Sequence, residues 1–588
     1  MNTGMDRLAV PRGFQTWALA VAVVVAVAST WPVAAHLSDH VVDGARIISA
    51  EHPEAWGPAN IGADVLTTTW IVNWMIHALA TQPLQPFDAN IFYPAPLASG
   101  YTEHLFATDL LGIPGRLVGG QVMAHQTALL LCLVLTAWTT AYVVTRWSGS
   151  IVGGLVAGIL FAASPFHQGQ MYHLQSLGTA YLPFVVFGLE RFSATGRPRW
   201  AGLAALAVVL QTLSGQYLGY FALVTALVCG VCGLVAGRAG EHGLLGRVRD
   251  AGWLAAAATG AAILALPFVV PYLRLSGSGE IPRQEALQLN ELYWLAAYRP
   301  HGNWQWAGIP APAWGLALGG ALVLVFGRRI ERVRAAMLVA VGVVGALFSL
   351  GNHGAWGIWT AASAIIPGFG SMREPIRFTV LPCLAIALLA GCGAAAVVRR
   401  SPRAGSVAVI ALAVLAAAEA WRGPLPLRRM PVGDTLPEVY RVLARCGDGD
   451  PLVEVPMAMP VDSFHDAEPQ YFSTFHWLPL LNGRAGYAPP TLDAVRTAVN
   501  VNLLATPGRR RLRKLTGVRW VLVHCRAQRS PVARELCNGR AWSQFPSRRF
   551  GVGDDAVALF DLGRVATLPR PVPRRPEPTA GCLDGPRG

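Results

Sequence analysis

Long apolar runs separated by short polar connections fill most of the chain, from Trp17 to Trp421. A bilayer core about 30 Å thick is crossed by roughly 20 apolar residues in a helix. The pattern therefore predicts about eleven membrane-spanning helices. Their predicted ranges are 17–35, 126–145, 151–166, 174–189, 200–213, 217–236, 251–272, 314–326, 335–350, 378–398 and 406–421.

The charges in the connections predict how these helices are oriented. Cytoplasmic loops carry an excess of Lys and Arg. Arg7 and Arg12 precede the first span, and every second connection after it is also basic. The basic connections hold Arg146; Arg191, Arg197 and Arg199; Arg238, Arg247 and Arg249; Arg328, Arg329, Arg332 and Arg334; and Arg399, Arg400 and Arg403. We therefore expect a multi-pass protein of the plasma membrane with a cytoplasmic N-terminus.

The connection between the first two spans, residues 37–120, has the opposite charge. Its only arginines are Arg46 and Arg116. Its acids are Asp39, Asp43, Glu51, Glu54, Asp64, Asp88, Glu103 and Asp109. This segment is therefore predicted to be an outer loop, and the odd number of spans places everything after Trp421 on the same, extracytoplasmic side. If the first apolar run is instead a cleaved signal peptide, the loop stays outside.

Beyond Gly423 the pattern changes to mixed polar sequence with short β-like runs at 452–455, 520–523 and 556–560. These predict a small α/β or α+β domain over residues 423–568. The tail, residues 569–588, is rich in Pro and Arg and is predicted to be disordered. If this region lies outside the cytoplasm, its cysteines can form disulfides. Their spacing does not determine how they pair. They are Cys446, Cys525, Cys537 and Cys582.

Composition supports a membrane domain. Hydrophobic residues make up 53% of the 588 residues and charged residues 14%, and the mean hydropathy is +0.41. So little polar surface cannot cover several soluble domains. The net charge of +14 comes almost wholly from arginines in short loops, with Lys514 as the only lysine. Because such charge sets membrane topology, we expect membrane lipid as a partner and no nucleic acid.

Two segments of the outer loop have recognisable patterns. Asp64 opens the stretch 64–74, in which Trp70 and Trp74 are four residues apart and would share a helix face near the membrane interface. An aspartate at a helix start is also a common N-cap. Further on follow Phe-Asp-Ala-Asn-Ile-Phe-Tyr-Pro-Ala-Pro at 87–96 and Tyr-Thr-Glu-His at 101–104. Loops of this length without regular structure are commonly functional.

This order of motifs resembles that of bacterial membrane proteins of the glycosyltransferase-C (GT-C) superfamily. The resemblance continues in Ser-Pro at 164–165, His-Leu-Gln at 173–175, Arg-Glu-Pro-Ile-Arg-Phe at 373–378 and Leu-Asn-Gly-Arg-Ala-Gly-Tyr at 481–487. It implies a mainly α fold, in which a polytopic transmembrane helical bundle of residues 1–422 carries the extracytoplasmic domain.

The resemblance also implies an activity. Such an enzyme takes a sugar from a polyprenyl-phosphate donor and transfers it, on the extracytoplasmic face, to a glycan, lipid or protein acceptor. The first outer loop of the superfamily carries an essential acid. Asp64 is the match by position, with Asp43, Asp88 and Glu103 as rivals. The loop has no tight Asp-x-Asp pair, so the sequence does not identify a metal site. A divalent cation, Mg²⁺ or Mn²⁺, is a candidate cofactor.

The chemistry of an inverting transfer fits these residue types. One carboxylate accepts the proton of the acceptor hydroxyl, and positive charge stabilises the departing phosphate. Asp64 suits the first role. Arg373 and Arg377 suit the second, because the topology places them at the outer mouth of a span and a guanidinium grips phosphate through two bonds. The alternative for these arginines is a structural pair with Glu374 or contact with lipid headgroups.

Histidines supply further candidates for substrate binding. His167 and His173 bracket a short outer turn, and His104 follows Glu103. We group these three with Trp70 as residues that could contact substrate. A histidine packed at the membrane interface is the alternative, because no second ligand follows at helical metal spacing.

Two other functions use similar features. A transporter or flippase for a lipid-linked glycan also needs many spans and phosphate-binding arginines, and it predicts charges or broken helices at the bilayer midplane. A non-catalytic scaffold would bind envelope glycan through the C-terminal domain. The charges of this chain concentrate at loop ends, which favours the transferase.

Overall fold

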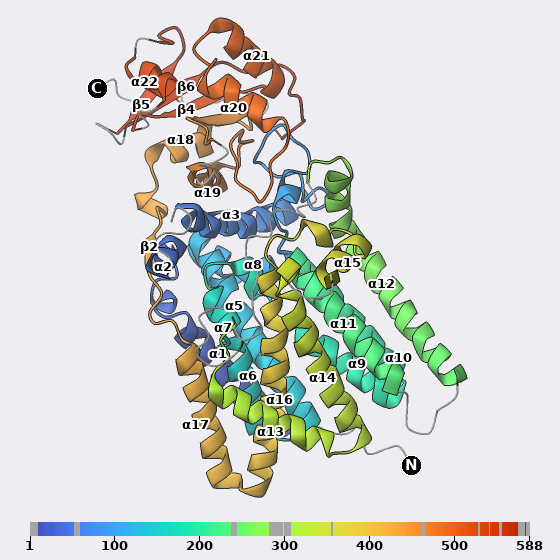
Figure 1. The fold of residues 1–588 in the computed structure, drawn as a ribbon. Helices are drawn as coiled ribbons and strands as arrows, with labels where there is room; N and C mark the ends of the chain where they lie inside the picture. Colours follow the sequence, from blue (N-terminus) through green and yellow to red (C-terminus); the bar gives the residue numbers. More distant parts are fainter. Residues whose placement is uncertain are drawn as a thin grey trace.

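Apolar helices form a bundle that carries a small domain at one end in the computed structural model (Figure 1). The structure describes residues 10–51, 59–236, 244–281, 298, 307–353, 357–459, 465–526, 530–539, 541–551, 556–573 and 583. The main helices of the bundle are α1 (Phe14–Ser29), α5 (Ile113–Ser148), α6 (Ile151–Ala162), α9 (Leu182–Thr195), α10 (Pro198–Leu213), α11 (Gln216–Ala236), α12 (Leu244–Gly277), α13 (Ala311–Val325), α14 (Arg329–Phe348), α16 (Val380–Arg400) and α17 (Pro402–Ala420). Short helices α7 (Pro165–Gly169), α8 (Leu174–Leu177) and α15 (Ile358–Ile365) lie between them.

Each predicted span overlaps one of these helices. The prediction for 174–189 is wrong in its boundaries, because α9 begins only at Leu182, with a proline in its first turn. Among the described residues, six helical segments are long and apolar enough to cross a membrane: Phe106–Ser148, Ile151–Gly169, Gln216–Ala236, Leu245–Gly277, Pro375–Arg400 and Pro402–Ala420. Helices α1, α10 and α13 are apolar but shorter. The polytopic helical fold is therefore confirmed.

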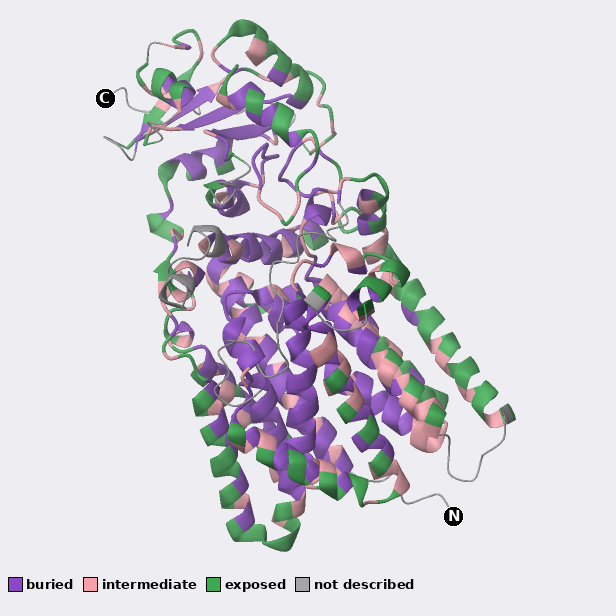
Figure 2. Ribbon diagram, in the orientation of Figure 1, coloured by how far each residue is buried: buried purple, intermediate pink, exposed green. Residues whose placement is uncertain are grey.

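The outer faces of the bundle are apolar. On α12, Ile263 and Leu264 are 64% and 59% exposed, and on α17 Val407 is 71% exposed. Figure 2 shows both helices largely exposed at the flanks of a buried centre. Water would penalise such surfaces, whereas lipid tails do not. These flanks therefore face the hydrocarbon of the membrane.

Small residues allow the central helices to pack closely. Helix α16 is buried along most of its length against α6, α13 and α14. A Cβ added at Gly391 would lie 2.7 Å from the backbone oxygen of Gly153 on α6. Small residues at helix contacts bring backbones together in membrane bundles. This contact holds α6 and α16 close together at the centre of the transmembrane domain.

The outer loop is largely helical. It holds α2 (Gly44–Glu51), α3 (Ala59–Thr81), the 3-10 turns η3 (Ala98–Tyr101) and η4 (Leu110–Gly112), and α4 (Phe106–Asp109). Helix α3 lies across the end of the bundle beneath the C-terminal domain (Figure 1). Trp70 and Trp74 stack with ring centroids 6.1 Å apart, so their predicted common face is confirmed. Asp64 lies inside α3 and is not its N-cap, because the helix begins five residues earlier than predicted.

The C-terminal domain contains a four-stranded mixed sheet. The three predicted runs form β3 (Leu452–Val455), β4 (Trp520–His524) and β6 (Val557–Asp561), and β5 (Ser547–Phe550) was not predicted. The strand order is β3-β4-β6-β5, with β3 parallel to β4 and the other neighbours antiparallel. Its helices are α18 (Glu438–Cys446), α19 (Ala467–His476), α20 (Leu492–Asn500), α21 (Thr506–Thr516) and α22 (Pro531–Cys537).

Covalent and polar contacts hold the far side of this domain. Cys525 and Cys537 form a disulfide that joins the end of β4 to the end of α22, and Cys582 lies outside the described residues. The tail is described at 569–573 and at 583. Arg570 donates hydrogen bonds to the carbonyls of Ala95 and Ala89, at 2.6 and 2.9 Å. The beginning of the tail is therefore held against the outer loop.

The outer loop and the C-terminal domain form one structural unit. The backbone N–H of Tyr93 donates to the Leu480 carbonyl at 2.9 Å, and the N–H of Phe92 donates to the Asn482 carbonyl at 3.1 Å. A second pairing joins β1 (His40–Val42) to β2 (Leu427–Arg429) in antiparallel register. Side chains of both regions also share one hydrophobic core. The two regions therefore lie on the same side of the membrane.

The arginine-rich turns lie at the opposite end of the bundle. The α13–α14 turn with Arg328 and the α16–α17 turn with Arg399 are both far from the C-terminal domain (Figure 1). This placement agrees with the predicted topology, in which the basic connections share one side and the acidic loop 37–120 lies on the other. Which end faces the cytoplasm stays a prediction.

Candidate active site

Asp64 is held from two sides at the boundary between α3 and the C-terminal domain. Arg484 donates to its Oδ1 at 2.5 Å, and Nε2 of His173 lies 3.1 Å from its Oδ2. The Asp64 side chain is 28% exposed. Both the carboxylate and the imidazole of this cluster were predicted as site residues, and the structure brings them together from positions 109 residues apart.

The surroundings keep Asp64 ionised. Burial alone would raise the pKa of this carboxyl, but the Arg484 guanidinium and the hydrogen bond with His173 outweigh burial and hold its pKa well below the usual range. Arg484 is itself positioned by Thr67, whose Oγ1 accepts its second bond at 2.9 Å, and by Gln470, whose Oε1 accepts the backbone N–H at 2.7 Å. Asp64 is therefore a fixed, charged hydrogen-bond acceptor.

A second charged cluster surrounds Arg377. Its guanidinium lies 2.5 Å from Glu374 and 3.7 Å from Glu103, and its Cζ is 4.7 Å from the centre of the Tyr217 ring. The hydroxyl of Tyr217 accepts the backbone N–H groups of Arg373 and Glu374, at 2.7 and 3.2 Å. The expected pair between Arg377 and Glu374 is present. Arg377 is therefore largely neutralised by protein carboxylates.

Arg373 has a different environment. Its Cζ lies 5.4 Å from the centre of the Tyr487 ring, and among the described residues no carboxylate forms an ion pair with it. A Cβ added at Gly486 would lie 3.0 Å from the Arg373 guanidinium. Arg373 is thus supported by an aromatic face and by a close backbone approach, and it interacts with Glu103 electrostatically without a described ion pair.

One segment of the C-terminal domain joins the two clusters. In residues 484–487, Arg484 pairs with Asp64, while Tyr487 lies against Arg373 and donates its hydroxyl to the carbonyl of Ser371 at 3.0 Å. Asp64 also interacts electrostatically with Arg377. A carboxylate and a guanidinium are therefore brought to one region by a single short stretch of chain.

Glu103 titrates in the neutral range. Burial raises its pKa to about 7, and repulsion from Glu374 adds to this, while Arg377 and Arg373 oppose it. The carboxyl therefore changes charge near neutral pH. Because it lies beside Arg377, its protonation alters the positive charge available to an anion.

The remaining predicted residues have structural contacts. Oδ1 of Asp88 accepts the backbone N–H of Leu97 at 2.8 Å and so closes its own loop. His104 is buried, with its two ring nitrogens 3.0 Å from the Tyr272 hydroxyl and 2.9 Å from the Thr212 carbonyl. These contacts connect the outer loop to α10 and α12. The structure brings neither Asp88 nor His104 into the Asp64 cluster.

His167 and Trp70 are also occupied by the protein. Each ring nitrogen of His167 lies 2.9 Å from a hydroxyl oxygen, that of Ser164 or that of Thr179. Trp70 is fully buried, and its Nε1 donates to Asn90 at 3.1 Å. Because all their polar ring atoms are paired inside the core, direct substrate contact does not fit the position of either residue. The packed-histidine alternative fits His167.

The described contacts of the Asp64 cluster include one carboxylate and one imidazole that could serve as metal ligands. Among the described residues, the group with three potential ligands within reach of one ion is His36, Asp39 and His40, which lies elsewhere in the outer loop. The use of a divalent cation, Mg²⁺ or Mn²⁺, stays a prediction.

Sequence reasoning missed Arg484, Tyr217 and Tyr487. Arg484 and Tyr487 lie in the 481–487 motif, which was noted for its pattern but given no role. Their partners lie 420 and 116 residues away in the chain, so no local spacing points to them. A signal did exist, because a conspicuous Gly-rich motif with an arginine in a predicted outer domain is a reasonable partner for an outer-loop acid.

The helical bundle, with α3 across one end and the C-terminal domain above it, is similar in fold to solved membrane transferases such as arabinofuranosyltransferase AftD. No protein-family model and no curated protein matches the sequence.

Two solved structures illustrate the similarity. Arabinofuranosyltransferase AftD from Mycobacteria matches 95% of this chain with a TM-score of 0.53 and 16% identity, and this chain spans 40% of the AftD chain. ArnT from Cupriavidus metallidurans, bound to undecaprenyl phosphate, matches 95% of this chain and 99% of its own, with a TM-score of 0.52 and 13% identity. At such identities the similarity establishes the fold.

Proposed function

We propose that the protein is an extracytoplasmic glycosyltransferase that takes its sugar from a polyprenyl-phosphate donor. The observation that carries the proposal is the segment 484–487, in which Arg484 pairs with the ionised Asp64 and Tyr487 lies against the guanidinium of Arg373. A base and a phosphate grip are the two groups that an inverting transfer requires. The fold supports the proposal, since ArnT with the same architecture was solved with undecaprenyl phosphate.

Each residue has a distinct role in the proposed reaction. Asp64 accepts the proton of the acceptor hydroxyl as that oxygen attacks the anomeric carbon of the sugar. The bond between this carbon and the phosphate oxygen breaks, and polyprenyl phosphate leaves with the electron pair. Arg373 holds the phosphate, because among the described residues it forms no ion pair, whereas Arg377 pairs with Glu374 and Glu103.

Two further groups assist these roles. His173 fixes the orientation of the Asp64 carboxylate, and its other ring nitrogen is held 3.2 Å from Gln170. Glu103, when protonated, leaves Arg377 with more of its positive charge and removes repulsion from the phosphate. The acceptor is a glycan, lipid or protein of the cell envelope.

The test is sugar transfer by the purified full chain in lipid nanodiscs, supplied with a panel of polyprenyl-phosphate sugars and an envelope extract as acceptor. We expect Asp64→Asn to lower the transfer rate by about 10²- to 10⁴-fold, since a general base contributes that much. Arg373→Gln should weaken donor binding more than folding. Asp88→Asn is the matched control, because its retained amide oxygen can still accept the Leu97 N–H.

Three outcomes would contradict the proposal. If Asp64→Asn transfers sugar at the wild-type rate, the base is assigned wrongly. If the wild-type protein binds the donor but never consumes it, the protein is a glycan-binding scaffold. Movement of intact donor between leaflets without transfer would instead identify a flippase.

A further inference from the structure

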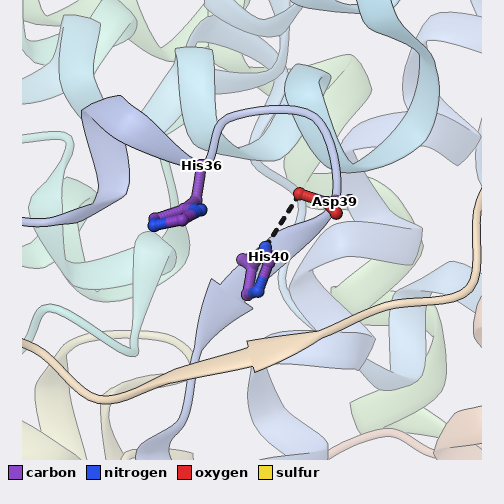
Figure 3. Close-up of side chains that lie close together, drawn as sticks. All are labelled: His36, Asp39 and His40. Atoms are coloured by element: carbon purple, nitrogen blue, oxygen red, sulfur yellow. Dashed lines mark hydrogen bonds and ion pairs between the residues drawn. The ribbon is translucent and has the colours of Figure 1, made fainter.

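Three potential metal ligands gather at the start of the outer loop, apart from the Asp64 cluster. His36, Asp39 and His40 each present one donor atom, and the three donor atoms lie within 4.8 Å of one another (Figure 3). The two imidazole rings are 4.7 Å apart between centroids. His36 is exposed and the other two residues are half-buried, so an ion can reach them from solvent.

The backbone holds these residues in place. His40 begins β1 and is paired in register with Arg429 of β2. His36 follows the 3-10 turn η2 (Val33–Ala35), and the His40 N–H donates to the His36 carbonyl at 3.3 Å. Gln126 of α5 donates to the His40 carbonyl at 2.6 Å. The ligand side chains therefore project from a short, tethered stretch and not from a free loop.

Neighbouring residues hold the Asp39 carboxylate in place. Oδ1 of Asp39 lies 2.8 Å from Nδ1 of His40, while Arg429 donates to its other oxygen, Oδ2, at 3.2 Å. The Met430 N–H donates to the Asp39 carbonyl at 2.7 Å. Outer contacts of this kind orient metal ligands. One carboxylate oxygen is thus held by β2, and the other faces the histidines.

We propose that His36, Asp39 and His40 bind one Zn²⁺ ion. Two imidazoles and one carboxylate form a borderline-soft set that suits Zn²⁺ better than Mg²⁺ or Mn²⁺, which prefer oxygen ligands in larger number. Water completes the fourth position. The ion joins His36, which follows η2, to His40 at the start of β1, and so fixes the turn that leads from α1 into the outer loop.

The test is zinc binding by the purified full chain after removal of metal by a chelator. We expect one Zn²⁺ per chain by elemental analysis after equilibrium dialysis, and loss of that ion in the double variant His36→Ala/His40→Ala. Asp39→Asn should weaken binding at least about tenfold. Zinc should raise the melting temperature of the wild type but not of the double variant. The control is His465→Ala, which removes an exposed histidine of the C-terminal domain.

Two results would overturn the proposal. If the double variant binds as much zinc as the wild type, the ion is adventitious. If the unmodified protein gives no visible absorption band of four-coordinate Co²⁺ when Co²⁺ replaces zinc, the three residues do not form a site. The cobalt measurement needs no variant, so a missing band overturns the proposal even if the double variant does not fold.

Discussion

The carboxyl group of Glu103 changes charge in the range in which cells work. Burial raises its pKa to about 7, so the folded protein holds a proton that the unfolded chain releases near pH 4.5. Because the folded state binds more protons between these values, the stabilisation is complete below about pH 4.5 and is lost as the pH rises through about 7.

We therefore expect the wild-type protein to lose thermal stability from about pH 5 to about pH 8 relative to Glu103→Gln, which cannot titrate. The measurement is the apparent melting temperature of both proteins in the same detergent across this range. Asp88→Asn should follow the wild-type curve. Parallel curves for the wild type and Glu103→Gln would show that Glu103 has an ordinary pKa in the folded protein.

Single residues also show what a sequence can and cannot reveal. The residue types of Asp64 and His173 and their positions beside apolar helices were enough to select both. His104 and His167 were selected by the same logic, yet their ring nitrogens contact core groups such as Tyr272 and Thr179. His104 and Tyr272 are 168 residues apart in the chain. No local pattern therefore distinguishes a histidine whose ring nitrogens are bonded within the protein from one that can contact substrate.

At the scale of elements, the disulfide between Cys525 and Cys537 closes β4 onto α22. Its sequence separation is 12 residues. Closing a loop of about that length limits the unfolded chain and typically stabilises a domain by about 3 kcal/mol. Disulfides also persist mainly in oxidising compartments, which supports an extracytoplasmic position for this domain.

We expect the double variant Cys525→Ser/Cys537→Ser to unfold with a free energy about 3 kcal/mol below that of the wild type. Chemical denaturation followed by protease sensitivity of the C-terminal domain measures this. Cys232→Ser is the control, because Cys232 is a free, half-buried cysteine of α11. An equal loss of stability in both variants would show that the disulfide itself contributes nothing.

The elements that were predicted well share a physical property. The long spans and the strands β3, β4 and β6 have patterns set by burial, which the sequence displays directly. Strand β5 escaped prediction because its sequence, Ser547 to Phe550, is largely polar and exposed. Its strand form depends on pairing with β6, which no local pattern displays.

At the scale of the whole molecule, the charge pattern predicts its orientation. Basic turns at one end of the bundle favour the cytoplasm. We expect alkaline phosphatase fused at the C-terminus to be active, and the same reporter inserted in the α16–α17 turn to be inactive. Green fluorescent protein should show the reverse. Activity of alkaline phosphatase at both positions would contradict the prediction that α17 crosses the membrane.

The joint between the outer loop and the C-terminal domain lay beyond sequence reasoning. The charge pattern predicted that the two regions share a compartment, but not that they share a core. That core depends on pairs such as Asn90 with Leu478, which are 388 residues apart. Pairings at such separation follow from the folded topology alone.

This separation has a consequence during biosynthesis. A ribosome adds about 5–20 residues per second, so roughly 20–80 s pass between the synthesis of Asn90 and that of its partner 388 residues later. During this time the aromatic segment around Phe92 lacks the part of the C-terminal domain that buries it in the folded protein. A nascent chain that stalls before residue 478 leaves that segment exposed to proteases. We therefore expect incomplete chains to be degraded.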